Sequence, residues 1–354
     1  MEELNLPTIC YNLLEMTDAQ KTVVYAKAGQ VIRNGGTVVF PTETVYGLGA
    51  DAMDPDAVRA IYRAKGRPSD NPLIIHVADF DLSKIVREIP ATAKLLMDKY
   101  WPGPLTIIMK KNPAVPDATT GSLDTVGVRM PDQAAALNLI RASRRFIAAP
   151  SANISGRPSP TTFRRCVEDL DGRVDMILGM DQSRVGLEST IIDLSGAVPE
   201  LLRPGAITLE MLEETIGHIL YQPTGLLEDA KAPRAPGMKY RHYAPKAKVT
   251  LFSGEPAKVR QAMLSRQKTN SLLIFIDDPT LGPFNESDLA KEQANIIKFD
   301  SVSQASHEIF ETMRQADDQN YQDILIQAVP EKGLGLSLMN RVKKAAAYDI
   351  EEVD

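Results

Sequence analysis

The first 217 residues alternate between short apolar runs and stretches with a helical period. Runs such as 37–40 (TVVF) and 105–110 (LTIIMK) are rich in β-branched residues and bounded by turn residues, which is typical of buried strands. One of the helical stretches starts at Thr17 with Gln20 three residues later, the spacing of a capping box. Strands mixed with helices in this way predict one α/β domain over residues 1–217, built on a twisted mixed sheet.

The pattern changes after residue 217. Residues 221–245 contain four prolines and two glycines and show no clear period, which favours a long connector. The runs KVTLF, SLLIFI, NIIKF and DILIQAV then follow, separated by helical patterns. Apolar strands that alternate with helices are typical of a parallel sheet. We therefore predict an extended linker at 218–247 and a smaller, Rossmann-like α/β domain at 248–354.

The formal net charge of −6 originates in the C-terminal part of the chain. Residues 250–354 hold 11 Lys and Arg against 17 Asp and Glu, whereas residues 1–249 hold 29 of each. This distribution excludes a protein that is basic throughout. Residues 230–248 hold six cations and no acid, and such a stretch suits phosphate or RNA as well as it suits a solvated linker.

Several classes of protein are disfavoured by what the sequence lacks. Cys10 and Cys166 are too few for a disulfide framework and lack the spacing of a metal site. No apolar run reaches the roughly 18 residues of a membrane helix, and the chain starts with acids rather than with Lys or Arg. We therefore expect a cytoplasmic protein without membrane contact. Signatures of phosphate loops, dinucleotide folds, zinc proteases and serine hydrolases are also missing.

Polar side chains recur where the predicted strands end. Five segments share this feature: 40–51 (FPTETVYGLGAD), 124–131 (DTVGVRMP), 150–161 (PSANISGRPSPT), 186–194 (GLESTIIDL) and 201–205 (LLRPG). Each segment alone is also compatible with an ordinary loop or turn, and we expect 40–51 to be a loop that leads to the next helix. One polar cavity at the edge of the sheet explains all five segments together. Its Arg, Ser, Thr and Asn content, with little acid, favours a site for anions.

The segment 65–77 (KGRPSDNPLIIHV) admits two interpretations. Lys65 and Arg67 follow a predicted helix, where cations complement the helix dipole, so their charge needs no ligand. That explanation does not account for the nearby Asn71. His76, in an apolar strand, is typical of a hydrogen-bonded core residue as well as of a functional one. A structural turn and a polar ligand-binding shelf both stay open on these residues alone.

Together these segments resemble a known family. GGTVVFPTETVYGLGADA, KGRPSDNPLIIHV, WPGPLTIIM, VGVRMPD, APSANISGRPSPT, GLESTIIDL, LLRPG and APGMKYRHYAP are similar, in this order, to motifs of the YrdC-like threonylcarbamoyl-AMP synthases in their two-domain form. The resemblance covers about residues 20–345. It implies a YrdC-like catalytic domain at 1–217 and a linker at 218–247 that closes over the active site. A carbamoyl-transfer maturation factor would share the first domain, but the chain lacks the zinc-finger cysteines of such proteins.

The resemblance also implies a reaction. L-threonine, bicarbonate and ATP give L-threonylcarbamoyl-AMP and pyrophosphate, with Mg²⁺ held through the ATP phosphates and with no protein metal site or organic prosthetic group. A downstream transferase complex uses the product to make threonylcarbamoyladenosine next to the anticodon of tRNAs that read codons beginning with A. A weak contact with tRNA stays open. The alternative is an RNA-binding or translation-regulating protein that uses the same basic cavity.

The family's site residues are implied at matching positions. Lys65 and Arg67 correspond to catalytic residues. The implied threonine site consists of Thr44, His76, Arg129 and Ser189. The implied ATP site consists of Lys65, Arg67, Asn71, Thr125, Ser151, Asn153, Ser159, Arg203 and Tyr243. In the linker, Tyr240 and Tyr243 would shield a labile intermediate from water.

Overall fold

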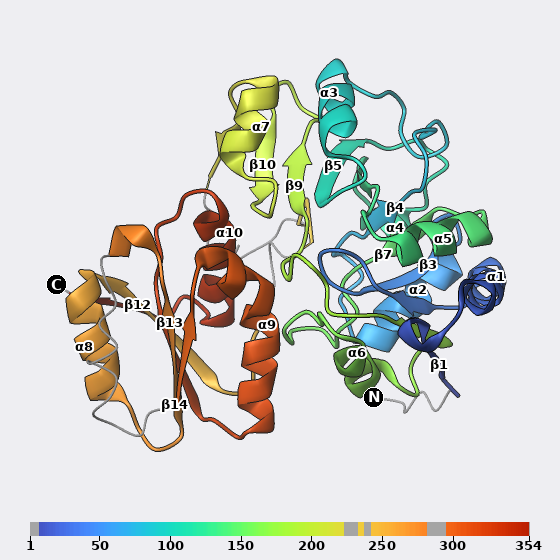
Figure 1. Ribbon diagram of the computed structural model, residues 1–354. Helices are drawn as coiled ribbons and strands as arrows, with labels where there is room; N and C mark the ends of the chain where they lie inside the picture. The colour runs from blue at the N-terminus through green and yellow to red at the C-terminus, as the bar shows by residue number, and fades with distance from the viewer. Residues whose placement is uncertain (1–6, 223–232, 237–241, 282–294, 354) are drawn as a thin grey trace. The chain divides into compact units, whose positions relative to one another are not determined.

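A computed structural model describes most of the chain, and Figure 1 shows its helices and strands. The described residues are 7–222, 233–236, 242–281 and 295–353. The chain forms two compact units, the first comprising Met1–Ser155 and Ser159–Tyr240 and the second Gly156–Pro158 and Arg241–Asp354. The predicted boundaries at 217/218 and 247/248 stay a prediction. None of the described helices is long and apolar enough to cross a membrane.

The first unit is built on one sheet in the strand order β1-β8-β2-β3-β7-β4-β6-β5-β9-β10-β11. Its strands are β1 (Ile9–Asn12), β2 (Val38–Phe40), β3 (Gly47–Asp51), β4 (Ile74–His76), β5 (Leu105–Lys110), β6 (Thr125–Arg129), β7 (Ile147–Ala149), β8 (Met176–Gly179), β9 (Thr190–Asp193), β10 (Glu200–Arg203) and β11 (Leu220–Tyr221). The pairing is mixed, since β4 pairs parallel with β6 and antiparallel with β7. The predicted mixed α/β fold is therefore confirmed.

The helices of this unit include several that begin or end at residues whose chemistry suits those positions. They are η1 (Leu13–Glu15), α1 (Asp18–Arg33), α2 (Pro55–Lys65), α3 (Ala91–Tyr100), α4 (Asp117–Thr120), α5 (Ala134–Ser143), α6 (Phe163–Leu170) and α7 (Leu209–Ile216). The predicted capping box of Thr17 and Gln20 is present at the start of α1. Helix α2 starts after the Asp54 cap and ends at Gly66, whose φ of 62° is the left-handed conformation that favours glycine.

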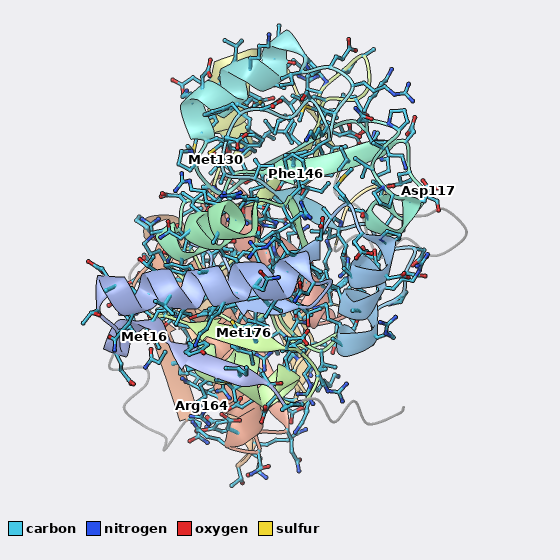
Figure 2. The ribbon with its side chains drawn as sticks, turned by 90° about the vertical axis from the view of Figure 1, so that its right-hand side faces the viewer. Met16, Asp117, Met130, Phe146, Arg164 and Met176 are labelled. Atoms are coloured by element: carbon cyan, nitrogen blue, oxygen red, sulfur yellow. The ribbon has the colours of Figure 1, made fainter. Side chains whose placement is uncertain are left out.

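Side-chain alternation along the strands places one apolar cluster on each face of the sheet. Val38 and Phe40 of β2 pack in a cluster with residues of α1 and α5, whereas Val39 packs in a cluster with residues of α2 and α3. Helices α1 and α5 contact each other and lie side by side in Figure 2. Gly29 permits this contact, because a Cβ atom there would lie 2.6 Å from the carbonyl carbon of Ala142.

The second unit is a smaller sheet in which every strand pair is parallel, in the order β14-β13-β15-β12-β16. Its elements are β12 (Lys248–Gly254), α8 (Pro256–Arg266), β13 (Ser271–Ile276), η2 (Pro279–Leu281), β14 (Asn295–Phe299), α9 (Val302–Asp318), β15 (Asp323–Gln327), α10 (Leu334–Ala345) and β16 (Ile350–Val353). The four predicted strands and their parallel pairing are confirmed. β16 was not predicted, because IEEV at the edge of a sheet has no apolar run.

The expectation that 40–51 is a loop as far as the next helix is wrong for its second half. Residues Gly47–Asp51 form β3, which pairs with β2 and β7. The glycines that suggested a loop are required by packing. A Cβ atom on Gly49 would lie 2.5 Å from Ile147 Cγ2 and 2.8 Å from Phe40 Cε1. The strand therefore passes beneath two buried side chains that leave no room for a larger residue.

We expect Gly49→Ala to lower the free energy of unfolding of the first unit by about 1–3 kcal/mol, because the new methyl group overpacks Ile147 and Phe40. Trp101 is buried in the core of this unit and is the single tryptophan of the chain, so its fluorescence during urea denaturation reports on this unit. Gly196→Ala is the control, because its Cβ atom would approach no heavy atom closer than 4.0 Å. Equal unfolding midpoints for the two variants would contradict the packing explanation.

Candidate active site

Two parallel strands of the first unit end side by side at predicted site residues. β4 ends at His76 and β6 ends at Arg129, and these two residues are register partners. Both are buried, with 4% of each residue exposed. The strand ends therefore bring together two of the four residues implied for a threonine site.

Arg129 is held on three sides. Its Nη1 donates a hydrogen bond of 2.9 Å to Thr44 Oγ1 and its Nε donates one of 3.3 Å to the Gly103 carbonyl. Its Nη2 lies 2.6 Å from Glu43 Oε1, in an ion pair of which both side chains are buried. A buried guanidinium is costly without a partner of opposite charge, and Glu43 supplies that charge. The planar cation is thus fixed in one orientation.

Glu43 was not among the predicted site residues, and the expectation of a site with little acid is wrong. Glu43 and Glu188 are both buried, with 2% and 6% of each residue exposed. Glu188 accepts a hydrogen bond from the Ser159 hydroxyl. The presence of an acid within the otherwise neutral stretch 40–50 was the available signal, since a buried acid needs a cation as its partner.

Ser189 lies in a second buried hydrogen-bonded group. Its hydroxyl lies 2.8 Å from Thr106 Oγ1, and Arg203 Nη2 donates to it over 3.1 Å. Arg203 Nε also donates to the Ser189 carbonyl over 3.0 Å. The structure thus joins two predicted residues, and it adds Thr106, which lies inside the apolar strand β5 and carried no sequence signal of its own.

Lys65, Ser151 and Asn153 form a third group. Only 1% of Lys65 is exposed, and its ammonium group donates to the carbonyls of Ser151 and Asn153. Ser151 Oγ donates in turn to Asn153 Oδ1 over 2.6 Å. Carbonyl groups take the place of water around the buried cation, so the three residues implied for the nucleotide hold one another in position.

Arg67 and Asn71 lie in the turn after α2. Arg67 Nη2 donates to the carbonyls of Asn71 and Pro72 over 3.4 and 3.3 Å. Within the described structure, Asn71 Oδ1 is buried and accepts no hydrogen bond. A buried acceptor without a partner is costly, and a ligand with an N–H or O–H group would satisfy it. This feature favours the ligand-binding interpretation of 65–77 over that of a plain turn.

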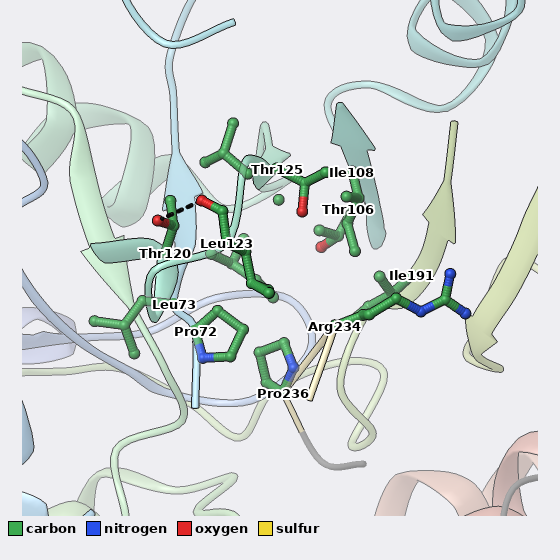
Figure 3. Close-up of a pocket in the computed structure, with 13 residues that line it drawn as sticks. Pro72, Leu73, Thr106, Ile108, Thr120, Leu123, Thr125, Ile191, Arg234 and Pro236 are labelled. Carbon is green, nitrogen blue, oxygen red and sulfur yellow. Dashed lines mark hydrogen bonds between the residues drawn. The ribbon is translucent and has the colours of Figure 1, made fainter. Parts of the chain in front are cut away.

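Thr125 lies apart from Arg129, at the opposite end of β6. It lines a narrow pocket with Thr106, Ile191 and Arg234, and Figure 3 shows how these side chains lie around it. The volume of about 10 Å³ is close to what one water needs. In this conformation the pocket is too small for a nucleotide.

Residues 233–236, a short described part of the linker in this unit, lie against the sheet. Ala235 is fully buried in an apolar cluster with Ile74, Ile108, Ile191 and Leu202. The neighbouring Arg234 forms ion pairs with Asp193 and Glu200, at 3.3 and 2.6 Å. Arg203 Nη1 donates to the Pro236 carbonyl over 3.3 Å. This part of the linker is therefore attached both to the strands and to a predicted site residue.

The loop 41–46 joins segments that are far apart in the sequence. The Tyr46 carbonyl accepts from the amide of Ala152 over 2.8 Å, and the Tyr46 amide donates to the Pro160 carbonyl over 3.0 Å. On the other side, the Thr44 carbonyl accepts from the amide of Gly186 over 3.1 Å. Backbone hydrogen bonds thus place the segments 150–161 and 186–194 on either side of the same loop.

Tyr243 belongs to the second unit, where its ring stacks on Phe310 with 5.2 Å between ring centroids. Its implied contact with a nucleotide stays a prediction. Tyr240 lies outside the described residues. Among the described residues there is no group of three or more His, Cys, Asp or Glu side chains that could hold a metal ion.

Burial lowers the pKa of His76 to about 3, and the neighbouring Arg129 charge acts in the same direction. His76 is therefore a neutral imidazole near pH 7. Its Nδ1 lies 3.2 Å from the Ile74 carbonyl, and its ring meets Phe40 edge-on. A neutral ring beside a fixed guanidinium suits binding and orientation rather than proton transfer.

Two family models match the chain, one over its N-terminal part and one over its C-terminal part. The Sua5/YciO/YrdC model, described as "Telomere recombination", matches residues 30–205. The model described as "Threonylcarbamoyl-AMP synthase, C-terminal domain" matches residues 207–347. The chain is 44% identical to the threonylcarbamoyl-AMP synthase of Pyrococcus abyssi over 98% of its length and 100% of the relative's, and 41% identical to that of Bacillus subtilis over 91% and 92%.

Solved structures agree with these matches. The crystal structure of Pyrococcus abyssi Sua5 complexed with L-threonine superposes with a TM-score of 0.87 at 42% identity, and covers 98% of this chain and 99% of the other. A structure of a doubly substituted form of that protein gives the same TM-score. The fold is that of the Sua5 structures, and the relatives define the class as an enzyme of the nucleotidyltransferase type. The chain belongs to the threonylcarbamoyl-AMP synthase family, which confirms the resemblance found in the sequence.

The lowered pKa of His76 predicts an acid sensitivity that is specific to this residue. Between about pH 6.5 and pH 3 the unfolded chain binds a proton at His76 and the folded chain does not, so stability is complete above pH 6.5 and is lost as the pH falls through this window. The loss is at most about 1.4 kcal/mol per pH unit. Urea denaturation followed by Trp101 fluorescence should give a shallower pH slope for His76→Gln than for the unmodified chain. The exposed His218→Gln is the control, and equal slopes for both variants would refute the prediction.

Proposed function

We propose that the chain synthesises L-threonylcarbamoyl-AMP and pyrophosphate from L-threonine, bicarbonate and ATP. The observation that carries this proposal is the buried Arg129 guanidinium, fixed by Thr44, Gly103 and Glu43 at the end of β6. A fixed, planar pair of N–H donors matches a carboxylate in a two-pronged contact. The threonine complex of the Pyrococcus abyssi relative supports an amino acid as one ligand of this fold.

The threonine site of the proposal consists of Thr44, His76, Arg129 and Ser189. Arg129 would take the carboxylate, and the neutral His76 ring and the Thr44 and Ser189 hydroxyls would surround the rest of the amino acid. Glu43 already balances the Arg129 charge, so a bound carboxylate would share the cation with it. A nearby carboxylate raises the pKa of an amine. The threonine amine would therefore stay uncharged most easily at a distance from Glu43.

The nucleotide site of the proposal is carried by Lys65, Arg67 and the neutral donors around them. Asn71, Thr125, Ser151, Asn153, Ser159 and Arg203 complete it, and Tyr243 stays an expectation. Cations and neutral donors fit a triphosphate, and the described residues offer no carboxylate cage, so Mg²⁺ would be held through the phosphates. When bound there, it supplies charge neutralisation on the phosphate oxygens.

The chemistry requires no enzyme nucleophile. The amine nitrogen of threonine forms a bond to carbon dioxide from bicarbonate and loses a proton, giving a carbamate and water. A carbamate oxygen then bonds to the α-phosphorus of ATP while the bond to pyrophosphate breaks. The enzyme's part is to align the reactants, which for ideal geometry is worth on the order of 7–11 kcal/mol, and to stabilise developing charge with fixed cations.

The product fits a place in tRNA modification. A threonylcarbamoyl group on AMP is activated for transfer, and a downstream transferase complex would move it to adenosine next to the anticodon of tRNAs reading codons that begin with A. The linker 218–247 would close over the site and keep water from the adduct, and the buried Ala235 supports this part of the proposal.

Arg129→Lys tests the proposed carboxylate contact. A point charge replaces the two-pronged donor, and we expect kcat/KM for threonine to fall roughly 10- to 100-fold, as for loss of a hydrogen bond to a charged group, with a smaller change in the KM for ATP. The assay follows pyrophosphate and labelled bicarbonate fixed on an AMP adduct, with serine in place of threonine as the substrate control. The matched variant is Arg184→Lys on the surface, where Arg184 pairs with Asp132.

Adduct formation that depends on threonine and bicarbonate is the expected result for the unmodified chain. RNA binding without any adduct or pyrophosphate, from a folded sample with a fast quench, would instead favour the RNA-binding alternative. Equal losses in Arg129→Lys and Arg184→Lys would remove Arg129 from the site.

Ala235→Asp tests the proposed closure. A carboxylate cannot remain among Ile74, Ile108 and Leu202 without a large desolvation cost, so the segment 233–236 should leave the sheet. We expect the yield of intact adduct to fall several-fold relative to pyrophosphate released, because water gains access to the adduct, with the Trp101 unfolding midpoint unchanged. The exposed Ala197→Asp is the matched control. An unchanged ratio of adduct to pyrophosphate in Ala235→Asp would refute the closure.

A further inference from the structure

The second unit contains a topological switch point, which no part of the proposed function uses. β12 and β15 are adjacent and parallel. In the strand order β14-β13-β15-β12-β16, the connection through α8 leads from β12 past β15 to β13, and the connection through α10 leads from β15 past β12 to β16. The two connections leave in opposite directions, and Figure 1 shows α8 and α10 on opposite sides of this sheet. In open parallel sheets, ligands bind in the crevice at the carboxyl ends of two such strands.

A pocket lies at these carboxyl ends. Its volume is about 220 Å³, and its lining comes from residues 252–254, Pro256, Val259, Leu281 and residues 327–330. Small-molecule sites usually measure about 300–1,000 Å³, so this one suits a ligand smaller than a nucleotide. Gln327, the last residue of β15, contributes to it, and so does its register partner Phe252, two residues before the end of β12.

Gln327 supplies a buried polar group without a partner. Only 2% of the residue is exposed, and within the described residues its Oε1 is buried and accepts no hydrogen bond. Residues two apart on a strand share a face, so Gln327 lies on the same face as Leu325, which packs in one cluster with Val259 and Met263 of α8. A buried amide oxygen that lacks a donor is costly, and a ligand that donates an N–H group would satisfy it.

The charges around the pocket exclude an anion. The lining contains no Lys, Arg or His among the described residues. The first turn of α8, where a phosphate would otherwise bind, is already capped by the Glu255 carboxylate, which accepts from the amides of Ala257 and Lys258. These hydrogen bonds lower the pKa of Glu255, so the carboxylate is charged near pH 7 and repels a phosphate.

The side chains that line the pocket suit a neutral ligand with an apolar ring. Phe252, Val259 and Val329 supply apolar walls, and the Gln327 amide presents an acceptor and donors on one planar group. A carboxamide pairs with the donor and acceptor atoms on the edge of a nucleobase, as Gln does with adenine. We propose that the second unit binds an uncharged nucleobase or nucleoside at the switch point between β12 and β15, with its base edge on Gln327.

Hydrogen–deuterium exchange of the full chain tests this proposal, because it locates protection by peptide. We expect millimolar adenine and adenosine to slow exchange several-fold in peptides covering 252–259 and 324–330, and AMP or inorganic phosphate to have little effect there. Gln327→Leu keeps the side-chain size but removes the amide, and should abolish the protection. Gln315→Leu, exposed on α9, is the matched control and should retain it.

A second variant tests the proposal in case Gln327→Leu does not fold. Ala328→Phe fills the pocket from a partly exposed position and should also abolish the protection. The proposal is overturned if neither adenine, adenosine, uracil nor uridine protects these peptides, if protection survives in both variants, or if AMP and inorganic phosphate protect as strongly as adenosine. Peptides of the first unit report on the catalytic site separately, so the two proposals can fail independently.

Discussion

The first unit depends on one buried ion pair, that of Arg129 and Glu43. Both side chains lie almost fully out of water, where either charge alone would cost several kcal/mol. Arg129 also needs Thr44 and the Gly103 carbonyl for its remaining donors, so the loop 41–46 must lie against the end of β6. That loop is in turn bonded through its backbone to the segments 150–161 and 186–194. One desolvated cation thus determines where three polar segments lie.

The Arg129 charge also affects the protonation state of its neighbour in the sheet. His76, beside Arg129 in the sheet, stays neutral because burial and the guanidinium both disfavour its protonated form. Lys65 is held in a different way, by donating to the Ser151 and Asn153 carbonyls. The site therefore contains fixed cations, neutral donors and two acids that already have partners, and His76 is not poised for proton transfer near pH 7. This combination suits catalysis by alignment and charge stabilisation rather than by a general acid and base.

Local signals made much of the fold predictable, and long-range packing explains what they missed. The Thr17 capping box and the Asp54-Pro55 start act within one turn of a helix, so the sequence alone reveals them. β3 was missed because Gly47 and Gly49 are typical of a loop in the sequence. Only the packing of Phe40 and Ile147 against the strand explains why glycine is needed there. The five polar segments showed where a site would lie. The roles of Glu43 and Thr106, however, depend on their contacts with Arg129 and Ser189, which are distant in sequence. Pairing of that kind leaves no local pattern.

The two units use the ends of strands in chemically opposite ways. In the first unit the strand ends carry Arg129 and Arg203, and the acids Glu43 and Glu188 are engaged by a cation and a hydroxyl. In the second unit the carboxyl ends of β12 and β15 carry Phe252 and Gln327, and Glu255 occupies the nearby helix start with negative charge. Because an anion is favoured in one place and repelled in the other, a phosphorylated substrate and an uncharged base would be sorted by charge alone. A chain that binds both ligands would then hold them without competition between the two sites.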